Sequence, residues 1–165
     1  MEEAKAFAPS HITGIFQIFD NSANALHAGS KGAGVSLKQG VETIVKVRKT
    51  SRSSLQVKVN GNVSHSAEVS KHVANTFFSS FKEARNCEVT VEHDVKVPIG
   101  AGFGTSGAAA LSLALALNEV FELKLPKIRV AQLAHIAEVE CKTGLGTVIA
   151  ETWGGAEIRV KPGAP

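Results

Sequence analysis

Aromatic residues are scarce in this sequence, which has no tyrosine and a single tryptophan, Trp153. Proteins that bind single-stranded nucleic acid stack the bases on aromatic side chains within a positively charged groove. No such combination exists here, and the 18 basic residues are scattered among 15 acidic ones. The formal net charge of +3 therefore favours a small anionic ligand over nucleic acid.

Cysteine is also scarce, since Cys87 and Cys141 are the only two. Two cysteines so far apart form neither a disulfide framework nor a zinc knuckle. We therefore expect buried, reduced thiols and a chain that works in a reducing cytoplasm.

Long hydrophobic runs are absent too. The most apolar stretch, Ala108–Leu117, is about half the length needed to cross a bilayer, so it predicts a buried helix. The segment Met1–Ala8 is polar and then apolar over a very short run, with no basic segment leading into a signal-peptide core. We expect neither a membrane anchor nor export. With 165 residues, the chain is close to the usual size of one domain.

The first quarter of the chain gives weak structural signals. Ala4–Ala8 is a short apolar run stopped by Pro9, which predicts a first strand. The following region, Ser10–Gly40, is rich in glycine, serine and asparagine. It predicts a long functional loop with one short strand near Val35.

Clearer periodicity begins after this region. Alternating apolar and polar residues predict strands at Glu42–Lys49 and Leu55–Val59, and the dipeptide Asn60-Gly61 predicts a tight hairpin turn. Two or three antiparallel strands should result. Apolar residues at four-residue steps then predict an amphipathic helix over Ser66–Ala84. Its inner face consists of Val69, Val73, Phe77 and Phe81.

The second half of the chain is more regular. A strand or strand pair, Val89–Val97, should end at Pro98, and helices are predicted over Thr105–Phe121 and Lys127–Lys142. The remaining expected elements are a glycine-punctuated loop, Thr143–Gly155, and a closing strand, Ala156–Val160. Strands and helices are mixed without the regular alternation of a doubly wound sheet. We therefore expect an α+β two-layer sandwich.

The most informative segment is Val97–Ala110, with the sequence VPIGAGFGTSGAAA. A strand stops, four glycines and two hydroxyl residues follow, and a long helix begins at once. Glycines let the backbone curve closely around an anion, and a helix start offers unpaired N–H groups and a positive dipole end. The pattern predicts a phosphate-binding loop. The plainer alternative is a glycine-rich turn in which Thr105 or Ser106 only caps the helix.

Two common phosphate-binding classes fit this segment poorly. A Walker loop needs a lysine before its serine or threonine, and the segment has no lysine. Gly102, Gly104 and Gly107 satisfy the GxGxxG dinucleotide fingerprint, but a lone match is a weak signal. That fingerprint expects a strand with an acidic residue soon after the helix, whereas a second helix follows here. A nicotinamide-dependent enzyme is thus the least favoured alternative.

The same segment resembles the GHMP kinases, a family named for galactokinase, homoserine kinase, mevalonate kinase and phosphomevalonate kinase. It follows the family signature PxxxGLGSSAA, with Phe103 in place of leucine, Thr105 in place of the first serine and Gly107 in place of an alanine. The matching positions are Pro98, Gly102, Gly104, Thr105, Ser106 and Ala108.

Two further regions carry the same resemblance. APSHITGIF at Ala8–Phe16, with GSKGAG at Gly29–Gly34, is similar to the opening of archaeal pantoate kinases, a branch of the family. KTGLGTVIAETWGG at Lys142–Gly155 resembles a later family loop that carries a catalytic acid in many members. Three separated motifs in the family's order argue against chance agreement.

This resemblance implies a ribosomal protein S5 domain 2-like sandwich over residues 1–165, forming the ATP-binding half of such a kinase. A second, ferredoxin-like C-terminal domain would begin where this sequence ends, so we expect it to be absent from the chain. The implied reaction transfers the γ-phosphoryl group of ATP to a hydroxyl. In the pantoate kinase branch this gives 4-phosphopantoate on the archaeal route to coenzyme A.

The resemblance also implies roles for individual residues. ATP and Mg²⁺ are the expected cofactors, with Ser106 and Glu138 holding the cation; Glu140, on another face of the same helix, is the competitor of Glu138. His11 and Ser30 are expected to bind the small-molecule substrate. The residues expected to bind the ATP phosphates are Pro98, Gly100, Gly102, Gly104, Thr105, Ser106 and Gly107.

The largest departure from the family is at Thr147, where pantoate kinases carry the catalytic aspartate of a GLGDV pattern. Threonine cannot act as a carboxylate base at neutral pH. Homoserine kinases also lack this aspartate and rely on positioning. Glu151, one turn further on if the segment is helical, is the candidate substitute. Thr147 and Glu151 are therefore the positions at which we expect catalysis.

Several alternatives stay open. The chain is either an active or partial kinase, or a non-catalytic nucleotide-binding module left when the second domain and the acid at position 147 were lost. The acceptor is pantoate or another hydroxylated molecule such as mevalonate, homoserine or shikimate. An uncovered face where the second domain should pack would favour a homodimer.

Overall fold

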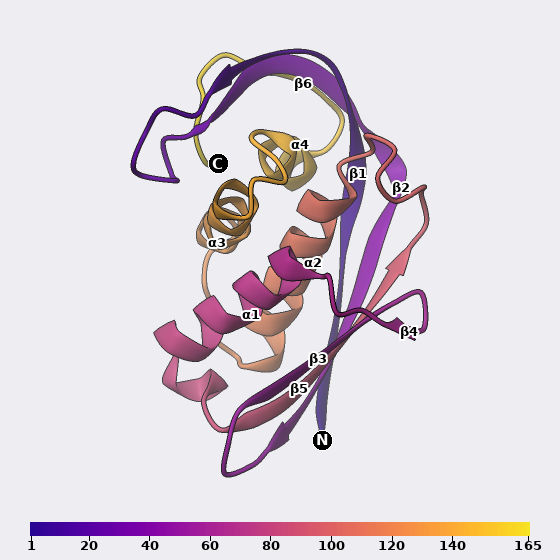
Figure 1. Cartoon of the computed structure of the whole chain (residues 1–165), viewed down its shortest axis with the longest axis vertical. Helices are drawn as coiled ribbons and strands as arrows, with labels where there is room; N and C mark the ends of the chain where they lie inside the picture. Colours follow the sequence, from indigo (N-terminus) through magenta and orange to yellow (C-terminus); the bar gives the residue numbers. More distant parts are fainter.

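The computed structural model describes residues 1–165 as a twisted sheet with helices on one face (Figure 1). The strands are β1 (Glu2–Phe19), β2 (Gly29–Lys49), β3 (Ser54–Val59), β4 (Asn62–Val63), β5 (Cys87–Val95) and β6 (Ala156–Arg159). The helices are α1 (Glu68–Ser80), α2 (Thr105–Val120), α3 (Lys127–Glu140) and α4 (Thr147–Trp153), with a 3₁₀ turn at Lys82–Ala84. This arrangement confirms the predicted α+β two-layer sandwich.

The largest correction to the prediction concerns residues 10–40, which form two long paired strands instead of a loop. β1 and β2 run antiparallel from the Glu2–Val47 pair to the Phe19–Gly29 pair, and register shifts interrupt them twice. Shifts of this kind bend a strand pair, and the pair arches over the helices (Figure 1). Pro9 does not stop β1 because β1 is an edge strand, where a missing N–H group is tolerated.

The glycines of residues 10–40 suggested a loop, but in the structure they allow the backbones of β1 and β2 to pack closely. A Cβ atom on Gly40 would lie 2.7 Å from the Cα atom of Pro9 on the neighbouring strand. Glycine inside a strand often marks such a close approach of backbones. Propensity alone could not show that the strand and its glycines are held by a partner far away in the sequence.

The centre of the sheet has mixed pairing. β2 pairs antiparallel with β5, and β5 pairs parallel with β3. The expected antiparallel pairing holds for β3 and β4 but not for β2 and β3, because β5 lies between them in the sheet. The chain passes from β3 through α1 before it enters β5, and such crossovers join parallel strands. The predicted hairpin between β3 and β4 is confirmed, with Asn60 and Gly61 at φ angles of 48° and 82°.

The helices confirm the predicted periodicities, with two adjustments. α1 stops at Ser80 and continues as the 3₁₀ turn, and its Phe77 is fully buried with the Phe81 ring centroid 5.3 Å away. Part of the predicted loop Thr143–Gly155 is the helix α4, whose Val148 and Thr152, four residues apart, are buried. None of the helices has the length and apolarity that crossing a bilayer requires.

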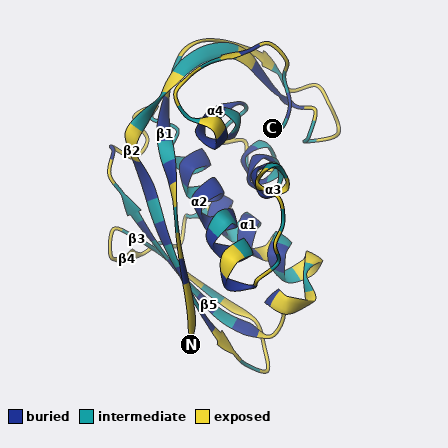
Figure 2. Cartoon of the chain, turned by 180° about the vertical axis from the view of Figure 1, so that it is seen from behind, coloured by how far each residue is buried: buried dark blue, intermediate teal, exposed yellow.

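Helix α2 lies at the centre of the helical layer, against β1 and β2 and beside the other three helices. Small residues such as Ala110 and Ala114 are fully buried on it, so its backbone approaches the sheet closely. Figure 2 shows buried residues along the faces where helices and sheet meet. Cys87 is buried in this core and Cys141 is half-buried, and both are free thiols.

A buried polar network ties α2 to the sheet. The Thr43 hydroxyl lies 2.7 Å from Nδ1 of His93 and 2.6 Å from the Ser112 hydroxyl, and Ser112 donates to the Ala108 carbonyl at 2.7 Å. Nε2 of His93 lies 3.0 Å from the Ser70 hydroxyl. Burial lowers the pKa of His93 to about 4, so the ring is neutral in the folded protein near pH 7.

This network predicts a pH-dependent stability. His93 has a pKa of 6.5 in the unfolded chain and of about 4 in the folded protein. Because the unfolded state therefore binds the proton more readily, the stabilisation from the neutral His93 is present above pH 6.5 and is lost as the pH falls toward 4. We expect urea unfolding to show a loss on the order of 2 kcal/mol from this group between pH 7 and pH 5. His93→Gln should remove that part, and an unchanged pH dependence in the variant would contradict this assignment.

Candidate functional site

The glycine-rich loop connects the end of β5 to the first turn of α2. Gly100, Gly102 and Gly104 have φ angles of 77°, 82° and 64°, a region that side-chain-bearing residues rarely adopt. Gly104 is the N-cap residue of α2, and no side-chain hydrogen bond caps this helix. The alternative that Thr105 or Ser106 serves only as a cap is therefore wrong. The first backbone N–H groups of α2 have no partner within the helix and mark its positive end.

A cavity of about 500 Å³ opens beside this loop, and we call it the loop cavity. Thr105 and Ser106 line it from the first turn of α2, and Thr143 lines it from the segment after α3. Apolar residues, among them Val69 and Ile99, form another part of the wall. An apolar wall next to the positive end of a helix suits a nucleotide, which has an apolar base and an anionic tail.

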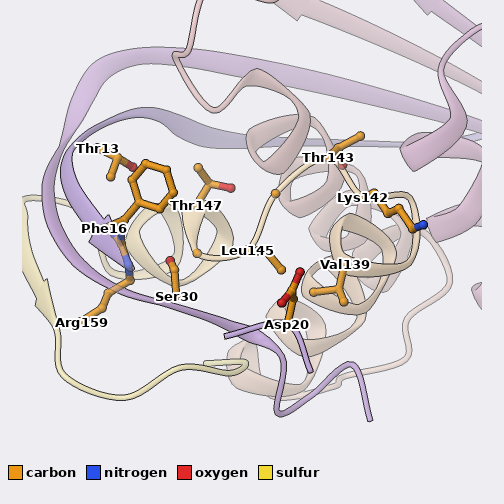
Figure 3. Close-up of a pocket in the computed structure, with 12 residues that line it drawn as sticks. Thr13, Phe16, Asp20, Ser30, Val139, Lys142, Thr143, Leu145, Thr147 and Arg159 are labelled. Atoms are coloured by element: carbon orange, nitrogen blue, oxygen red, sulfur yellow. The ribbon is translucent and has the colours of Figure 1, made fainter. Parts of the chain in front are cut away.

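A second cavity, of about 610 Å³, lies under the arch of β1 and β2, and we call it the hairpin cavity (Figure 3). Its charged and hydroxyl-bearing lining residues are Thr13, Asp20, Ser30, Lys142, Thr143, Thr147 and Arg159. In Figure 3, Ser30, Thr147 and Arg159 lie toward one side of the cavity and Asp20 and Lys142 toward the other. Because Thr143 lines both cavities, the two adjoin.

Two buried carboxylates lie near both cavities. Glu138 on α3 accepts hydrogen bonds from the hydroxyls of Thr143 at 2.9 Å and Thr147 at 2.6 Å. Glu151 on α4 is 2% exposed, and neither of its carboxyl oxygens has a hydrogen-bond partner. Burial and the nearby Glu138 charge raise the pKa of Glu151 well above its usual value. Glu140, the competitor of Glu138, instead contacts His72 at 2.7 Å on the exposed side of α3.

The first turn of α2 packs directly against these carboxylates. A Cβ atom on Gly107 would lie 2.7 Å from Oε2 of Glu151, 2.9 Å from Oγ1 of Thr147 and 3.0 Å from Oε2 of Glu138. A Cβ atom on Gly104 would lie 2.7 Å from Oε1 of Glu151. Three oxygen-bearing side chains from α3 and α4 therefore converge on this turn, and a Cβ atom at Gly107 would have to displace their ends.

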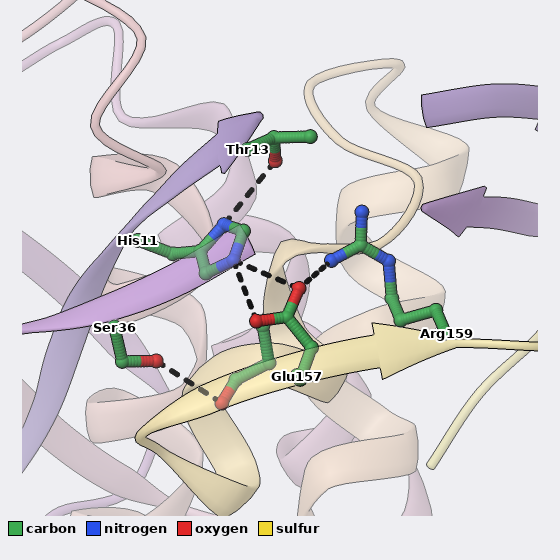
Figure 4. A network of polar contacts seen from close by, with 6 residues as sticks. His11, Thr13, Ser36, Glu157 and Arg159 are labelled. Atoms are coloured by element: carbon green, nitrogen blue, oxygen red, sulfur yellow. Dashed lines mark hydrogen bonds and ion pairs between the residues drawn. The ribbon is translucent and has the colours of Figure 1, made fainter. Parts of the chain in front are cut away.

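His11 sits behind the site rather than in it. Its ring is fully buried and lines neither cavity; Nε2 lies 3.0 and 3.1 Å from the Glu157 carboxylate oxygens, and Nδ1 lies 3.2 Å from the Thr13 hydroxyl (Figure 4). Burial lowers the pKa of His11, and the Glu157 carboxylate acts in the opposite direction. The His11 backbone N–H also donates to the Phe103 carbonyl in the glycine-rich loop at 3.0 Å. His11 thus connects the loop with the hairpin cavity.

Arg159 is a site residue that the sequence did not reveal. It forms an ion pair with Glu157, lines the hairpin cavity, and keeps a buried Nε atom without a partner. A Cβ atom on Gly146 would lie 3.0 Å from this Nε and close to the Ser30 hydroxyl. Glu157 and Arg159 are two residues apart on β6, so they share a face of that strand. This spacing is the feature of the sequence from which their pairing could have been predicted.

His135 was also missed. Its Nε2 lies 3.1 Å from the Ala25 carbonyl and 2.9 Å from the Ala28 carbonyl, and burial lowers its pKa. A neutral ring whose Nε2–H donates to these carbonyls holds the turn between β1 and β2 against α3. The predicted substrate residue Ser30 follows directly after this turn and is buried at the cavity wall.

Comparison with known proteins identifies the class. The model of the GHMP kinases N terminal domain matches residues 68–155, and the chain belongs to the GHMP kinase family. Its curated relatives include the pantoate kinases of Methanocaldococcus jannaschii, 38% identical over 159 residues, and Thermococcus kodakarensis, 40% identical over 165 residues. These alignments cover 96% and 98% of this chain but 54% and 53% of the relatives. The chain thus spans about half the length of the curated relatives it matches.

Solved structures agree with this assignment. A phosphotransferase related to the CoA biosynthesis pathway matches with a TM-score of 0.89 and 38% identity, over 99% of this chain and 54% of that one. Homoserine kinase from Cytophaga hutchinsonii matches with a TM-score of 0.69 and 18% identity, over 96% of this chain and 48% of that one. The second match shows a shared fold alone. The dinucleotide-binding alternative drawn from the GxGxxG match is wrong, since the segment lies within the matched kinase domain.

The tight packing at Gly107 predicts a large effect of one methyl group. We expect Gly107→Ala to destabilise the protein by about 1–3 kcal/mol, because the added Cβ atom must displace the side chains of Glu138, Thr147 and Glu151. Gly14→Ala is the matched control, since a Cβ atom there would lie 3.6 Å from its nearest neighbour. Thermal unfolding of both variants tests this, and equal midpoints would contradict the described packing.

Proposed function

We propose that this chain is the ATP-binding half of a kinase that transfers the γ-phosphoryl group of ATP to a hydroxyl of pantoate or a similar hydroxy acid. The observation that carries the proposal is the uncapped start of α2, whose positive-φ glycines and free hydroxyls lie beside one cavity. That cavity adjoins a second one, whose lining includes Lys142 and Arg159. Pantoate kinase relatives that align with nearly the whole chain support this acceptor. The product, 4-phosphopantoate, would enter coenzyme A synthesis in an archaeal cytoplasm.

The loop cavity would hold ATP. The curve of the backbone from Pro98 through Gly100, Gly102 and Gly104 would cradle the phosphates, which the N–H groups from Thr105 to Gly107 would bind at the positive end of α2. The hydroxyls of Thr105 and Ser106 line the cavity and are available to the β- and γ-phosphates. The apolar wall formed by residues such as Val69 would accommodate the base.

The surroundings of Glu138 fit a magnesium ion. Mg²⁺ prefers oxygen ligands, and in nucleotide sites it is bound by one or two carboxylates together with the phosphates. Glu138 offers a buried carboxylate whose orientation is fixed by Thr143 and Thr147, and the Ser106 hydroxyl lines the adjoining cavity. A bound Mg²⁺ would neutralise charge on the transferring phosphoryl group.

The hairpin cavity would hold the acceptor. Nε of Arg159 and the hydroxyl of Ser30 lie around the same point beside Gly146, and Arg159 keeps its orientation through Glu157 and His11. An arginine with a free N–H group next to a hydroxyl is suited to binding a carboxylate. His11 would therefore act on the substrate by positioning Arg159, and Ser30 by direct contact.

Phosphoryl transfer depends mainly on positioning and charge neutralisation, so the threonine at position 147 is compatible with activity. Thr147 lines the acceptor cavity and orients the Glu138 carboxylate through its hydroxyl. The same threonine favours a second candidate function, a module that binds nucleotide without catalysis. Pantoate-dependent release of ADP would support the kinase, and Mg-ATP binding without turnover would support the module.

Nucleotide binding at the loop is tested by calorimetric titration with Mg-ATP. We expect the protein to bind, and Ser106→Ala to weaken binding by at least about tenfold, because a hydrogen bond to a charged group contributes about 1.5–3 kcal/mol. Ser80→Ala, at the exposed end of α1, is the matched control and should bind like the parent. Absence of binding by the folded parent would contradict the proposed function.

Acceptor binding is tested separately from turnover. Arg159→Gln should weaken binding of pantoate, measured by titration in the presence of Mg-ADP, by about tenfold or more while leaving Mg-ADP affinity within about twofold. Arg129→Gln, on the exposed side of α3, removes an arginine outside both cavities and should change neither affinity. Equal pantoate binding by both variants would exclude Arg159 as the carboxylate partner.

A further inference from the structure

Glu151 is the one buried carboxylate of the site without a partner. It is 2% exposed, and neither carboxyl oxygen makes a hydrogen bond. An ionised carboxylate held in this way costs several kcal/mol unless a positive charge or donor compensates it. No lysine, arginine or histidine pairs with Glu151, whereas Glu157 in the neighbouring network has both His11 and Arg159. The missing partner is therefore not a side chain among residues 1–165.

The groups around Glu151 identify the kind of partner. From α2 it faces Gly104 and Gly107, from α4 it faces Thr147, and from α3 it faces the second carboxylate, Glu138. Oε2 of Glu151 and Oε2 of Glu138 both lie within 3.0 Å of the point where a Cβ atom of Gly107 would be. Two carboxylates and a hydroxyl around one point form a hard oxygen donor set that suits a small divalent cation.

We infer that Glu151 is a second carboxylate ligand of the divalent cation, beside Glu138, at the first turn of α2. Glu151 lies four residues after Thr147 on α4, so the two share a helix face. Glu151, on the next turn of α4, thus supplies the negative charge near the cation that Thr147 cannot supply. This inference rests on the proposed function only in that the cation would arrive with ATP.

A second explanation for Glu151 is a neutral carboxylic acid that merely fills space. Glu151→Gln separates the two, because glutamine keeps the length and shape of the side chain but cannot supply a negative charge. Replacing a buried charge by a neutral group of similar volume is often neutral or stabilising. We therefore expect the variant to fold with a thermal midpoint equal to or above that of the parent. Glu151→Met, which is similar in size and apolar, serves as a second variant.

The experiment is a titration of the purified protein with Mn²⁺ alone, with free Mn²⁺ measured by electron paramagnetic resonance. Glu151→Gln and Glu151→Met should each weaken Mn²⁺ binding by at least about tenfold, as should Glu138→Gln. Glu140→Gln is the matched control, since this exposed carboxylate on α3 pairs with His72 and should leave the affinity within about twofold. Parent-like Mn²⁺ affinity in both Glu151 variants would overturn the inference and leave the space-filling role.

The two proposals fail in different ways. If Mg-ATP binds to the parent and is lost in Ser106→Ala, but Mn²⁺ affinity does not depend on Glu151, the inference is wrong and the proposed function stands. If Mn²⁺ binding depends on Glu151 but Mg-ATP does not bind, the cation site is correct and the proposed function is wrong.

Discussion

The close approach of the first turn of α2 to α3 and α4 is the constraint on which the site depends. The glycines at positions 104 and 107 leave no side chain between that turn and the oxygens of Glu138, Thr147 and Glu151. Gly144 contributes from the other side, since a Cβ atom there would lie 2.8 Å from the carboxyl carbon of Glu138. Backbone N–H groups that attract anions and carboxylates that attract cations are thus brought together. An ATP molecule with its magnesium ion needs both within one site.

A second constraint couples the two cavities through β1. The His11 backbone holds the glycine-rich loop at Phe103, while its ring holds Glu157, which in turn holds Arg159 in the hairpin cavity. One residue therefore fixes the glycine-rich loop and the hairpin cavity relative to each other. Phosphoryl transfer depends on such alignment because the reacting oxygens must be in line and close together.

Much of the fold and part of the site could be predicted from the sequence. Helical spacing identified α2 and α3, and the glycine and hydroxyl pattern identified the loop before α2, because these features are local. The strand character of residues 10–40 could not be predicted in the same way, since it depends on pairing between β1 and β2 across a long separation. The helix α4 was missed because its glycine-rich flanks predict a loop, whereas burial of Val148 and Thr152 stabilises a short helix.

The missed site residues have the same explanation. Arg159 and His135 function through contacts with the hairpin formed by β1 and β2, so their roles appear only when that hairpin is placed correctly. The family resemblance favoured Glu138 over Glu140. The structure adds that the two carboxylates lie on different sides of α3, Glu138 beside Thr143 and Thr147 and Glu140 beside His72. Glu151 was expected to replace a catalytic acid, and the structure adds that its carboxylate is buried and has no hydrogen-bond partner.

The binding of ATP and Mg²⁺ at the first turn of α2 is tested most directly by a crystal structure of the protein with Mg²⁺ and a non-hydrolysable ATP analogue. We expect the β- and γ-phosphates to lie against the backbone of residues 104–107 and the cation to contact Ser106 and Glu138. A nucleotide bound elsewhere, with the first turn of α2 free of phosphate, would contradict it.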